Sequence, residues 1–177
     1  CDQMEFWYRI GDDAGAFPLQ RLTPRTQACD DGTTTQPAAD APKGLAIDGA
    51  WLDPAQSGQG FTFNTTGARF GSFLAGWFTY DTDNGVDDDD AQHWFTLQGA
   101  TPERYGQSVL VSIHRTTGGS RAGTPTLNSH QVGSALLTID DCAHATLDYA
   151  FDDSAVAGPF ADRARRVQLS RLGACPQ

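Results

Sequence analysis

The chain is predicted to be all-β: an antiparallel meander barrel or sandwich of about eight strands, with an extra N-terminal hairpin closed by a disulfide. Short segments with alternating apolar residues are separated by Gly, Asp, Asn and Pro turns, a spacing typical of antiparallel β domains. No window holds a sustained 3.6-residue period, so helices are not expected. Four cysteines bracket two similar segments, one at each end of the chain.

Composition supports a packed core and excludes several function classes. Hydrophobic residues make up 39% of the 177 residues and aromatic residues 10%, which is enough for a globular core. The formal net charge of -10 would repel phosphate backbones and anionic membrane surfaces. No apolar run has the length of a membrane span. We therefore expect no nucleic-acid partner and no membrane insertion.

The two ends of the chain contain an internal repeat. Cys1–Ile10 aligns with Cys142–Phe151, and the segment from Leu19 to Leu22 aligns with the segment from Leu169 to Leu172. Each copy ends in a second cysteine, Cys29 or Cys175. In the first strand the apolar residues match at alternate positions, as in a strand with one buried face: Met4 with Ala145, Phe6 with Leu147, Tyr8 with Tyr149 and Ile10 with Phe151.

The repeat suggests how the cysteines pair. In an antiparallel hairpin the start of the first strand lies beside the end of the second, within disulfide distance. Of the three pairings that four cysteines allow, we therefore expect Cys1 with Cys29 and Cys142 with Cys175. The alternatives are buried free thiols and zinc, although the chain has no Cys-x-x-Cys pair. Disulfides form in oxidising compartments, so we expect a secreted, extracellular protein.

The repeat also divides the chain. Residues 1–29 form a hairpin that repeats the end of the main domain, residues 30–43 are a polar linker containing Pro, and residues 44–177 are the all-β domain. Repeats of this kind occur in tandem, and the chain begins abruptly at Cys1. We expect it to be a processed or excised piece of a larger protein.

Strands of the main domain are predicted near 46–52, 60–65, 70–80, 91–99, 107–115, 133–140, 145–151 and 166–172. Asp53-Pro54 and Ser57-Gly58-Gln59-Gly60 supply the first turn. In the fifth and sixth segments one side is apolar and the other polar, as Val109, Val111 and Ile113 show. Phe73–Tyr80 is apolar on both sides, so this strand is either covered on both faces or binds something on its outer face.

Three motifs between residues 49 and 99 resemble the pattern of a known family. They read Gly-x-Trp-x-Asp-Pro-x-x-Ser-Gly-x-Gly from Gly49, then Trp-Phe-x-Tyr-Asp from Trp77, then Trp-Phe-x-x-x-Gly from Trp94. The chain resembles a family of secreted proteobacterial β domains over roughly residues 44–177. It departs from the family pattern at Leu52, where an aromatic is usual, and in an acidic insert after Tyr80. The resemblance implies the compartment and the fold class but no activity. The matching residues are Trp51, Asp53, Pro54, Ser57, Gly58, Gly60, Trp77, Tyr80 and Trp94.

Five aromatic residues are candidates for ligand binding. An aromatic platform can stack on a sugar ring or line a small pocket. The alternative is that these side chains belong to the core, as large aromatics in strands usually do. The five are Trp51, Trp77, Phe78, Tyr80 and Trp94.

An acidic loop is the candidate metal site. Residues 81–90 contain six Asp around one Gly, and clustered carboxylates suit Ca²⁺. The candidate ligands are Asp81, Asp83, Asp87 and Asp89, but their spacing misses a calcium-loop motif by one residue. The alternative is a solvated loop that prevents strand-edge pairing.

Catalytic signals are sparse. The four His lack metal-site spacing, Ser57 lacks a Gly-x-Ser-x-Gly elbow, and the only Glu residues are Glu5 and Glu103. The leading expectation is a non-enzymatic secreted module that acts as a binding or assembly unit of a larger or tandem-repeat extracellular protein. Its partners would be other copies of itself, neighbouring domains, or a carbohydrate. The alternatives are a subunit of an extracellular fibre and a secreted hydrolase with a spatially assembled site.

Overall fold

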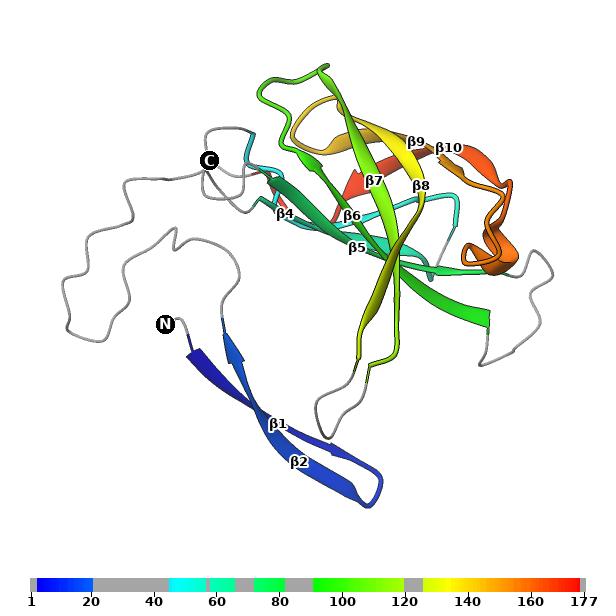
Figure 1. Cartoon of the computed structure of the whole chain (residues 1–177). Helices are drawn as coiled ribbons and strands as arrows, with labels where there is room; N and C mark the ends of the chain where they lie inside the picture. The colour runs from blue at the N-terminus through cyan, green and yellow to red at the C-terminus, as the bar shows by residue number, and fades with distance from the viewer. Residues whose placement is uncertain are drawn as a thin grey trace.

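The computed structural model describes residues 3–20, 45–56, 58–65, 72–81, 91–119 and 126–175. The strands form a closed eight-stranded barrel and a separate two-stranded sheet (Figure 1). The predicted all-β class is therefore confirmed, and of the two architectures left open the barrel is the one observed. Within the described part of the chain, no helix has the length and apolar character needed to span a bilayer.

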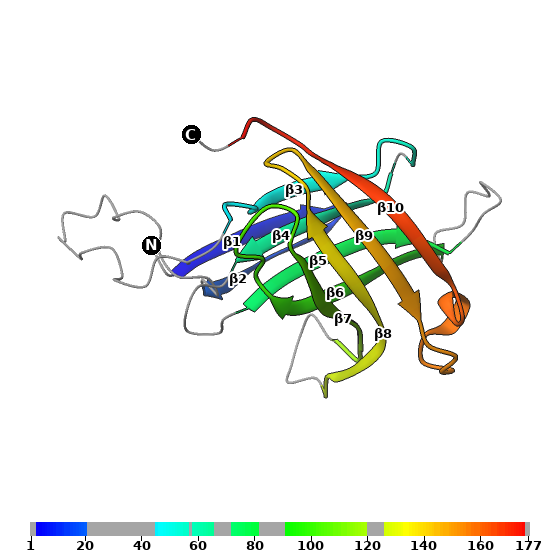
Figure 2. The same cartoon turned by 90° about the horizontal axis from the view of Figure 1, so that it is seen from above.

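The barrel is an antiparallel meander in which each strand pairs with the next along the chain. The last strand also pairs with the first, which closes the barrel. All eight predicted strands are present. Their bounds are β3 (Gly49–Leu52), β4 (Gly60–Thr65), β5 (Ser72–Tyr80), β6 (Gln92–Ala100), β7 (Ser108–Thr117), β8 (Asn128–Ile139), β9 (His144–Phe151) and β10 (Ala164–Arg171). Figure 2 shows the last strand, β10, between β9 and β3.

Side chains of alternate residues fill the barrel interior, as expected for eight strands. Phe61 stacks on Trp77 with ring centroids 5.2 Å apart, and Trp51 stacks on Phe63 at the same distance. Aliphatic side chains of β6 to β10 complete the core. The fully buried members include Leu97, Val111, Ile113, Leu137, Ile139 and Leu147.

A short 3-10 helix, η2 (Gly158–Phe160), in the β9–β10 connection was not predicted. It brings the buried Phe160 ring against Phe95 and Phe151, at centroid distances of 5.0 and 5.1 Å. One turn of helix carries no periodic signal, which is why the sequence does not reveal it. Phe160 therefore contributes a side chain to the barrel core although it lies in the β9–β10 connection and not in a strand.

Strand β8 begins five residues before the predicted start at 133. The first four added residues are polar and lack alternation. A register shift then pairs Ile113 with Gly133 and His114 with Gln131, which leaves Val132 as a buried bulge residue. At Gly133 a Cβ atom would overlap the carbonyl oxygen of Ala150, so the close approach of β8 and β9 requires glycine there.

The N-terminal hairpin is confirmed as β1 (Gln3–Ile10) and β2 (Asp13–Gln20), joined by a two-residue turn at Gly11, whose φ is 59°. No other described strand pairs with either one. The Cys142–Cys175 disulfide is also confirmed, with Cα atoms 5.6 Å apart. The predicted Cys1–Cys29 disulfide and the predicted linker 30–43 lie outside the described residues.

Candidate functional site

Strand β5 buries one face and exposes the other. Phe73, Ala75 and Trp77 point into the barrel, whereas Phe78 and Tyr80 are 53% and 38% exposed on its outside. No second layer of described residues covers this outer face. Of the two explanations for a strand that is apolar on both sides, burial on both faces is therefore wrong, and an outer face available for binding remains.

The neighbouring strand β6 extends this exposed aromatic area. Trp94 is 53% exposed and is the cross-strand partner of Phe78, while Gln92 is the partner of Tyr80. Directly opposed side chains in antiparallel strands lie within contact range of each other. We refer to Phe78, Tyr80, Gln92 and Trp94 as the aromatic surface.

The aromatic surface contains a shallow, open pocket of about 260 Å³. A glycine makes room for the Tyr80 ring. A Cβ atom at Gly58 would come within 3.2 Å of the Tyr80 ring. Gly58 also has a φ of 84°, which favours glycine. The pocket is lined by Gly58, Phe78, Thr79, Tyr80, Gln92, His93 and Trp94.

Polar contacts beneath the aromatic surface fix the ends of β5 and β6. The Thr79 hydroxyl donates to the side-chain oxygen of Gln59 at 2.7 Å. The His93 Nε2 atom lies 2.9 Å from the Asp81 carboxylate, and the His93 ring packs edge-on against Phe160. These contacts hold the strands that carry the exposed rings, so the aromatic surface stands on a rigid base.

The structure does not bring the five predicted aromatic residues together. Trp51 and Trp77 lie in the core, 1% and 3% exposed. The Trp51 indole donates to the carbonyl oxygen of Ile47 at 3.0 Å, and the Trp77 ring packs between Phe61 and Tyr149. Neither offers a surface to a ligand, so the predicted platform reduces to its other three members.

Trp94 could have been assigned to the outside from the sequence. It is in phase with Thr96 and Gln98, two polar residues, and out of phase with Phe95 and Leu97. Gln92, which no motif singles out, is in the same outward phase.

The predicted calcium ligands are only partly described. Asp81 directly follows β5 and contacts His93, whereas Asp83, Asp87 and Asp89 lie outside the described residues. Among the residues that the structure describes, no group of three or more metal-ligating side chains comes together. Calcium binding by this loop stays a prediction.

Asp53 of the Asp-Pro motif has a structural role. Its carboxylate is 10% exposed and accepts a hydrogen bond from the backbone N–H of Ala55 at 2.9 Å, closing the turn after β3. Arg165 of β10 lies 3.9 Å from the same carboxylate. The motif therefore joins the turn after the first barrel strand to the last barrel strand.

Three of the four described histidines contact a carboxylate or a hydroxyl side chain, and these contacts form no catalytic triad. His114 contacts the Ser112 hydroxyl at 2.9 Å, and His144 contacts the Asp141 carboxylate at 2.9 Å. The hydrogen bond from His144, followed by one from the Ala143 N–H, lowers the pKa of Asp141 below its ordinary value. No hydrogen bonds among the described residues join a Ser, a His and an Asp in one chain, and Ser57 is outside them. The hydrolase alternative gains no support.

Comparison of the chain with protein-family models, with curated proteins and with solved structures returned no match.

Proposed function

We propose that the chain is a non-enzymatic secreted β module that serves as a binding or assembly unit of a larger or tandem-repeat extracellular protein. The aromatic surface is its binding site. The observation that carries this proposal is that Phe78 and Trp94 lie side by side on the outside of strands whose inner faces already supply the core. Exposed apolar side chains gathered in this way are typical of binding sites.

The ligand that suits this surface is a neutral sugar ring. Flat aromatic faces offer apolar contact, while the Gln92 amide offers a donor and an acceptor to hydroxyl groups. The pocket of about 260 Å³ is below the roughly 300–1,000 Å³ of sites for drug-sized ligands, which favours one or two rings. The net charge of -10 disfavours anionic ligands.

An extracellular location agrees with the Cys142–Cys175 disulfide, because such bonds persist in oxidising compartments. The family resemblance points to the same compartment in bacteria. Calcium is a candidate cofactor, bound by the acidic segment 81–90 that connects β5 to β6 in the sequence. Calorimetry with Ca²⁺ on the whole chain tests this: no heat at millimolar metal would remove calcium from the proposal.

Binding to an array of neutral glycans, followed by calorimetry with the best ligand, tests the proposal. We expect Trp94→Ala to weaken binding at least about tenfold, the loss of about 1.4 kcal/mol typical of a stacking residue. Tyr105→Ala is the matched control, because Tyr105 is 49% exposed and lies outside the aromatic surface. Absence of binding to any glycan, or equal effects of the two substitutions, would contradict sugar binding at this site.

A subunit of an extracellular fibre is the second candidate. It is favoured by the exposed apolar side chains of the N-terminal hairpin, where Met4, Phe6 and Ile10 are 60%, 45% and 71% exposed. A structural repeat that leaves such a face open needs another molecule to cover it. Negative-stain electron microscopy of concentrated protein tests this candidate, and dispersed particles without filaments would count against it.

A further inference from the structure

The N-terminal hairpin reproduces the pairing of the hairpin that closes the barrel. The sequence repeat aligns β1 with β9 and β2 with β10, each strand separately. The observed strand pairing agrees with both alignments at once. Met4 pairs with Leu19 as Ala145 pairs with Leu169, Phe6 pairs with Phe17 as Leu147 pairs with Val167, and Gln3 pairs with Gln20 as His144 pairs with Ser170.

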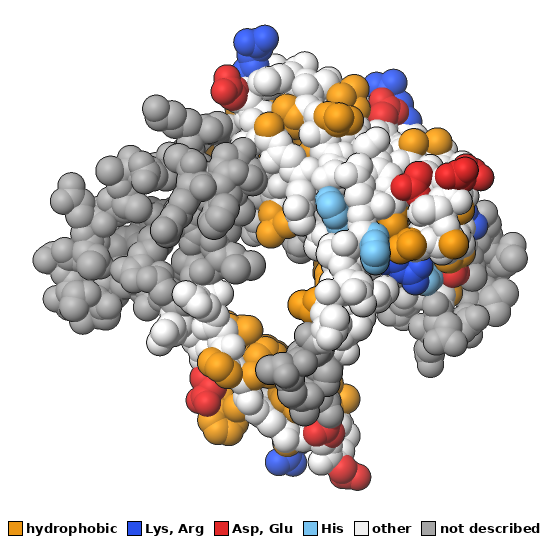
Figure 3. Space-filling model, in the orientation of Figure 1, with side chains coloured by type: hydrophobic (Ala, Val, Ile, Leu, Met, Phe, Trp, Pro, Cys, Tyr) orange, Lys and Arg blue, Asp and Glu red, His pale blue; other side chains and the backbone are white. Residues whose placement is uncertain are grey.

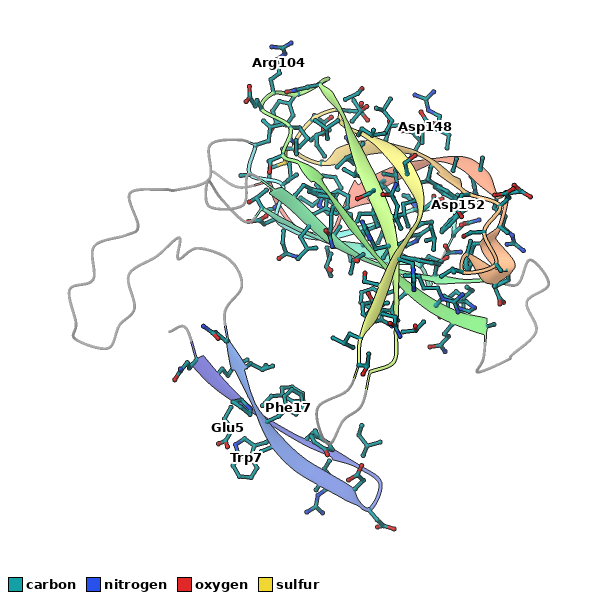
Figure 4. All side chains as sticks on the ribbon, in the orientation of Figure 1. Glu5, Trp7, Phe17, Arg104, Asp148 and Asp152 are labelled. Carbon is teal, nitrogen blue, oxygen red and sulfur yellow. A yellow bond between two sulfur atoms is a disulfide. The ribbon has the colours of Figure 1, made fainter. Side chains whose placement is uncertain are left out.

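The two hairpins also carry apolar residues at the positions that face the barrel interior in β9 and β10. In β9 and β10, Ala145, Leu147 and Leu169 point into the barrel. Their counterparts Met4, Phe6 and Leu19 share one face of the N-terminal hairpin with Phe17, which is 40% exposed. Figure 4 shows Phe17 on this face and Glu5 and Trp7 on the opposite one, and Figure 3 shows hydrophobic side chains gathered on the hairpin. A face built for a barrel interior is thus left uncovered by the described residues.

The backbone of β2 suits the position of β10. At the end of β10 the N–H of Arg171 donates to the Ala143 carbonyl on the β9 side. The N–H of the next residue, Leu172, donates to the Ala50 carbonyl on the β3 side, and both distances are 2.8 Å. Along a strand, the backbone N–H and C=O groups of alternate residues point to opposite neighbouring strands. The backbone groups of Gln168 therefore point to the β3 side. The pairing of β10 with β3 covers only Ser170 and Arg171, so it does not reach back to Gln168. Pro18, the counterpart of Gln168, therefore loses no hydrogen bond to a neighbouring strand.

We propose that β1–β2 is a second closing hairpin, and that its apolar face is covered by the β3–β8 sheet of another copy of this barrel when the β9–β10 hairpin of that copy is displaced. In that complex β1 pairs with β8 and β2 pairs with β3, as β9 and β10 do within one barrel. This proposal rests on the assembly part of the proposed function and gives it a mechanism, strand addition at two open sheet edges.

The chain's own hairpin closes its own barrel for three reasons. It follows β8 directly, its connection supplies the buried Phe160, and the Cys142–Cys175 disulfide ties its two ends together. The β1–β2 hairpin has a two-residue turn and no counterpart of Phe160. It also places Phe6 and Phe17 where the barrel holds the smaller Leu147 and Val167, which strains a core packed for those residues. The β1–β2 hairpin therefore enters only a barrel whose own β9–β10 hairpin is absent or displaced.

The test disables β9–β10 within the full chain. Leu147 and Leu169 are 0% and 1% exposed, so L147D/L169D places two carboxylates in the core and expels that hairpin. The β1–β2 hairpin of a second molecule then finds open β8 and β3 edges. Hydrogen exchange followed by mass spectrometry reports which hairpin is paired. We expect residues 3–20 to gain protection, residues 144–171 to lose it, and β3–β8 to keep part of theirs.

Two further variants identify the face that is used. F6D/L147D/L169D places a charge on the apolar face of β1 and should abolish protection of β3–β8 and residues 3–20. W7D/L147D/L169D places the same charge on the opposite face, where Trp7 is 73% exposed, and should behave as L147D/L169D does. Size-exclusion chromatography with light scattering should show a dimer or a larger assembly of L147D/L169D. A monomer with protected residues 3–20 would mean closure within one chain and would contradict the proposal.

The proposal is overturned if β3–β8 lose protection equally in L147D/L169D and in F6D/L147D/L169D, or if residues 3–20 stay unprotected in both. Neither result depends on the aromatic surface, since none of these variants touches Phe78 or Trp94. Glycan binding by the unaltered chain can therefore fail while hairpin exchange succeeds, and the reverse.

Discussion

At the scale of single residues, Trp51 and Trp94 have the same side chain in opposite environments. Trp51 is 1% exposed, stacks on Phe63 and donates its indole N–H to Ile47, whereas Trp94 is 53% exposed. We expect Trp51→Ala to lower the free energy of unfolding by about 3–5 kcal/mol, because a large cavity opens in the core. Trp94→Ala should change it by no more than about 0.5 kcal/mol. Urea denaturation measures both, and a large loss in Trp94→Ala would give Trp94 a structural role instead of a binding one.

At the scale of elements, the Cys142–Cys175 disulfide links the residues that precede β9 to those that follow β10, at the end of the hairpin opposite its connection. Its loop spans 33 residues, for which chain entropy gives a stabilisation of about 3–4 kcal/mol. Replacing both cysteines by serine should lower the free energy of unfolding by that amount while the barrel remains folded. Urea unfolding of the variant and of the unaltered chain makes the comparison. An unchanged stability would mean that the hairpin ends stay together without the bond.

Period-two alternation explains which elements the sequence could predict. It located all eight barrel strands to within a few residues and the N-terminal hairpin through its match to the last two strands. It could not choose between barrel and sandwich, because both bury alternate residues and differ only in whether β10 reaches β3. The start of β8, with its polar run, and the single turn at Phe160 carry no period.

The candidate site was predictable only in part, for a similar reason. Alternation separates Phe78 and Tyr80 from Trp77 within one strand, and it places Trp94 opposite Phe95 and Leu97 in the next. It does not reveal that Phe78 and Trp94 are cross-strand partners, because that depends on the register of β5 against β6. Register is set by the turn and by packing, neither of which a single sequence displays.

At the scale of the whole molecule, the barrel is closed by its shortest strand pairing, between β10 and β3, which we call the seam. Strands β10 and β3 share only two paired positions, Ser170 with Leu52 and Arg171 with Trp51. The Arg171 side chain compensates for this. Its guanidinium donates to the carbonyl oxygens of Ala46, at 2.9 Å, and Asp48, and it lies over the Trp51 ring at 5.6 Å. One side chain thus joins the last strand to the segment that leads into the first.

Substitution of Arg171 by lysine should therefore open the barrel at this seam. The lysine ammonium keeps the charge but has no planar fork to reach two carbonyl oxygens together and stacks less well on an indole. We expect a loss of about 1.5–3 kcal/mol in the free energy of unfolding, the usual contribution of hydrogen bonds from a charged donor. Hydrogen exchange should become faster in β3 and β10 than in β5 to β8, because opening begins where pairing is shortest. Arg104→Lys is the control, since Arg104 is exposed in the β6–β7 loop (Figure 4). A uniform rise in exchange around all eight strands would show that closure is shared among them and does not depend on the seam.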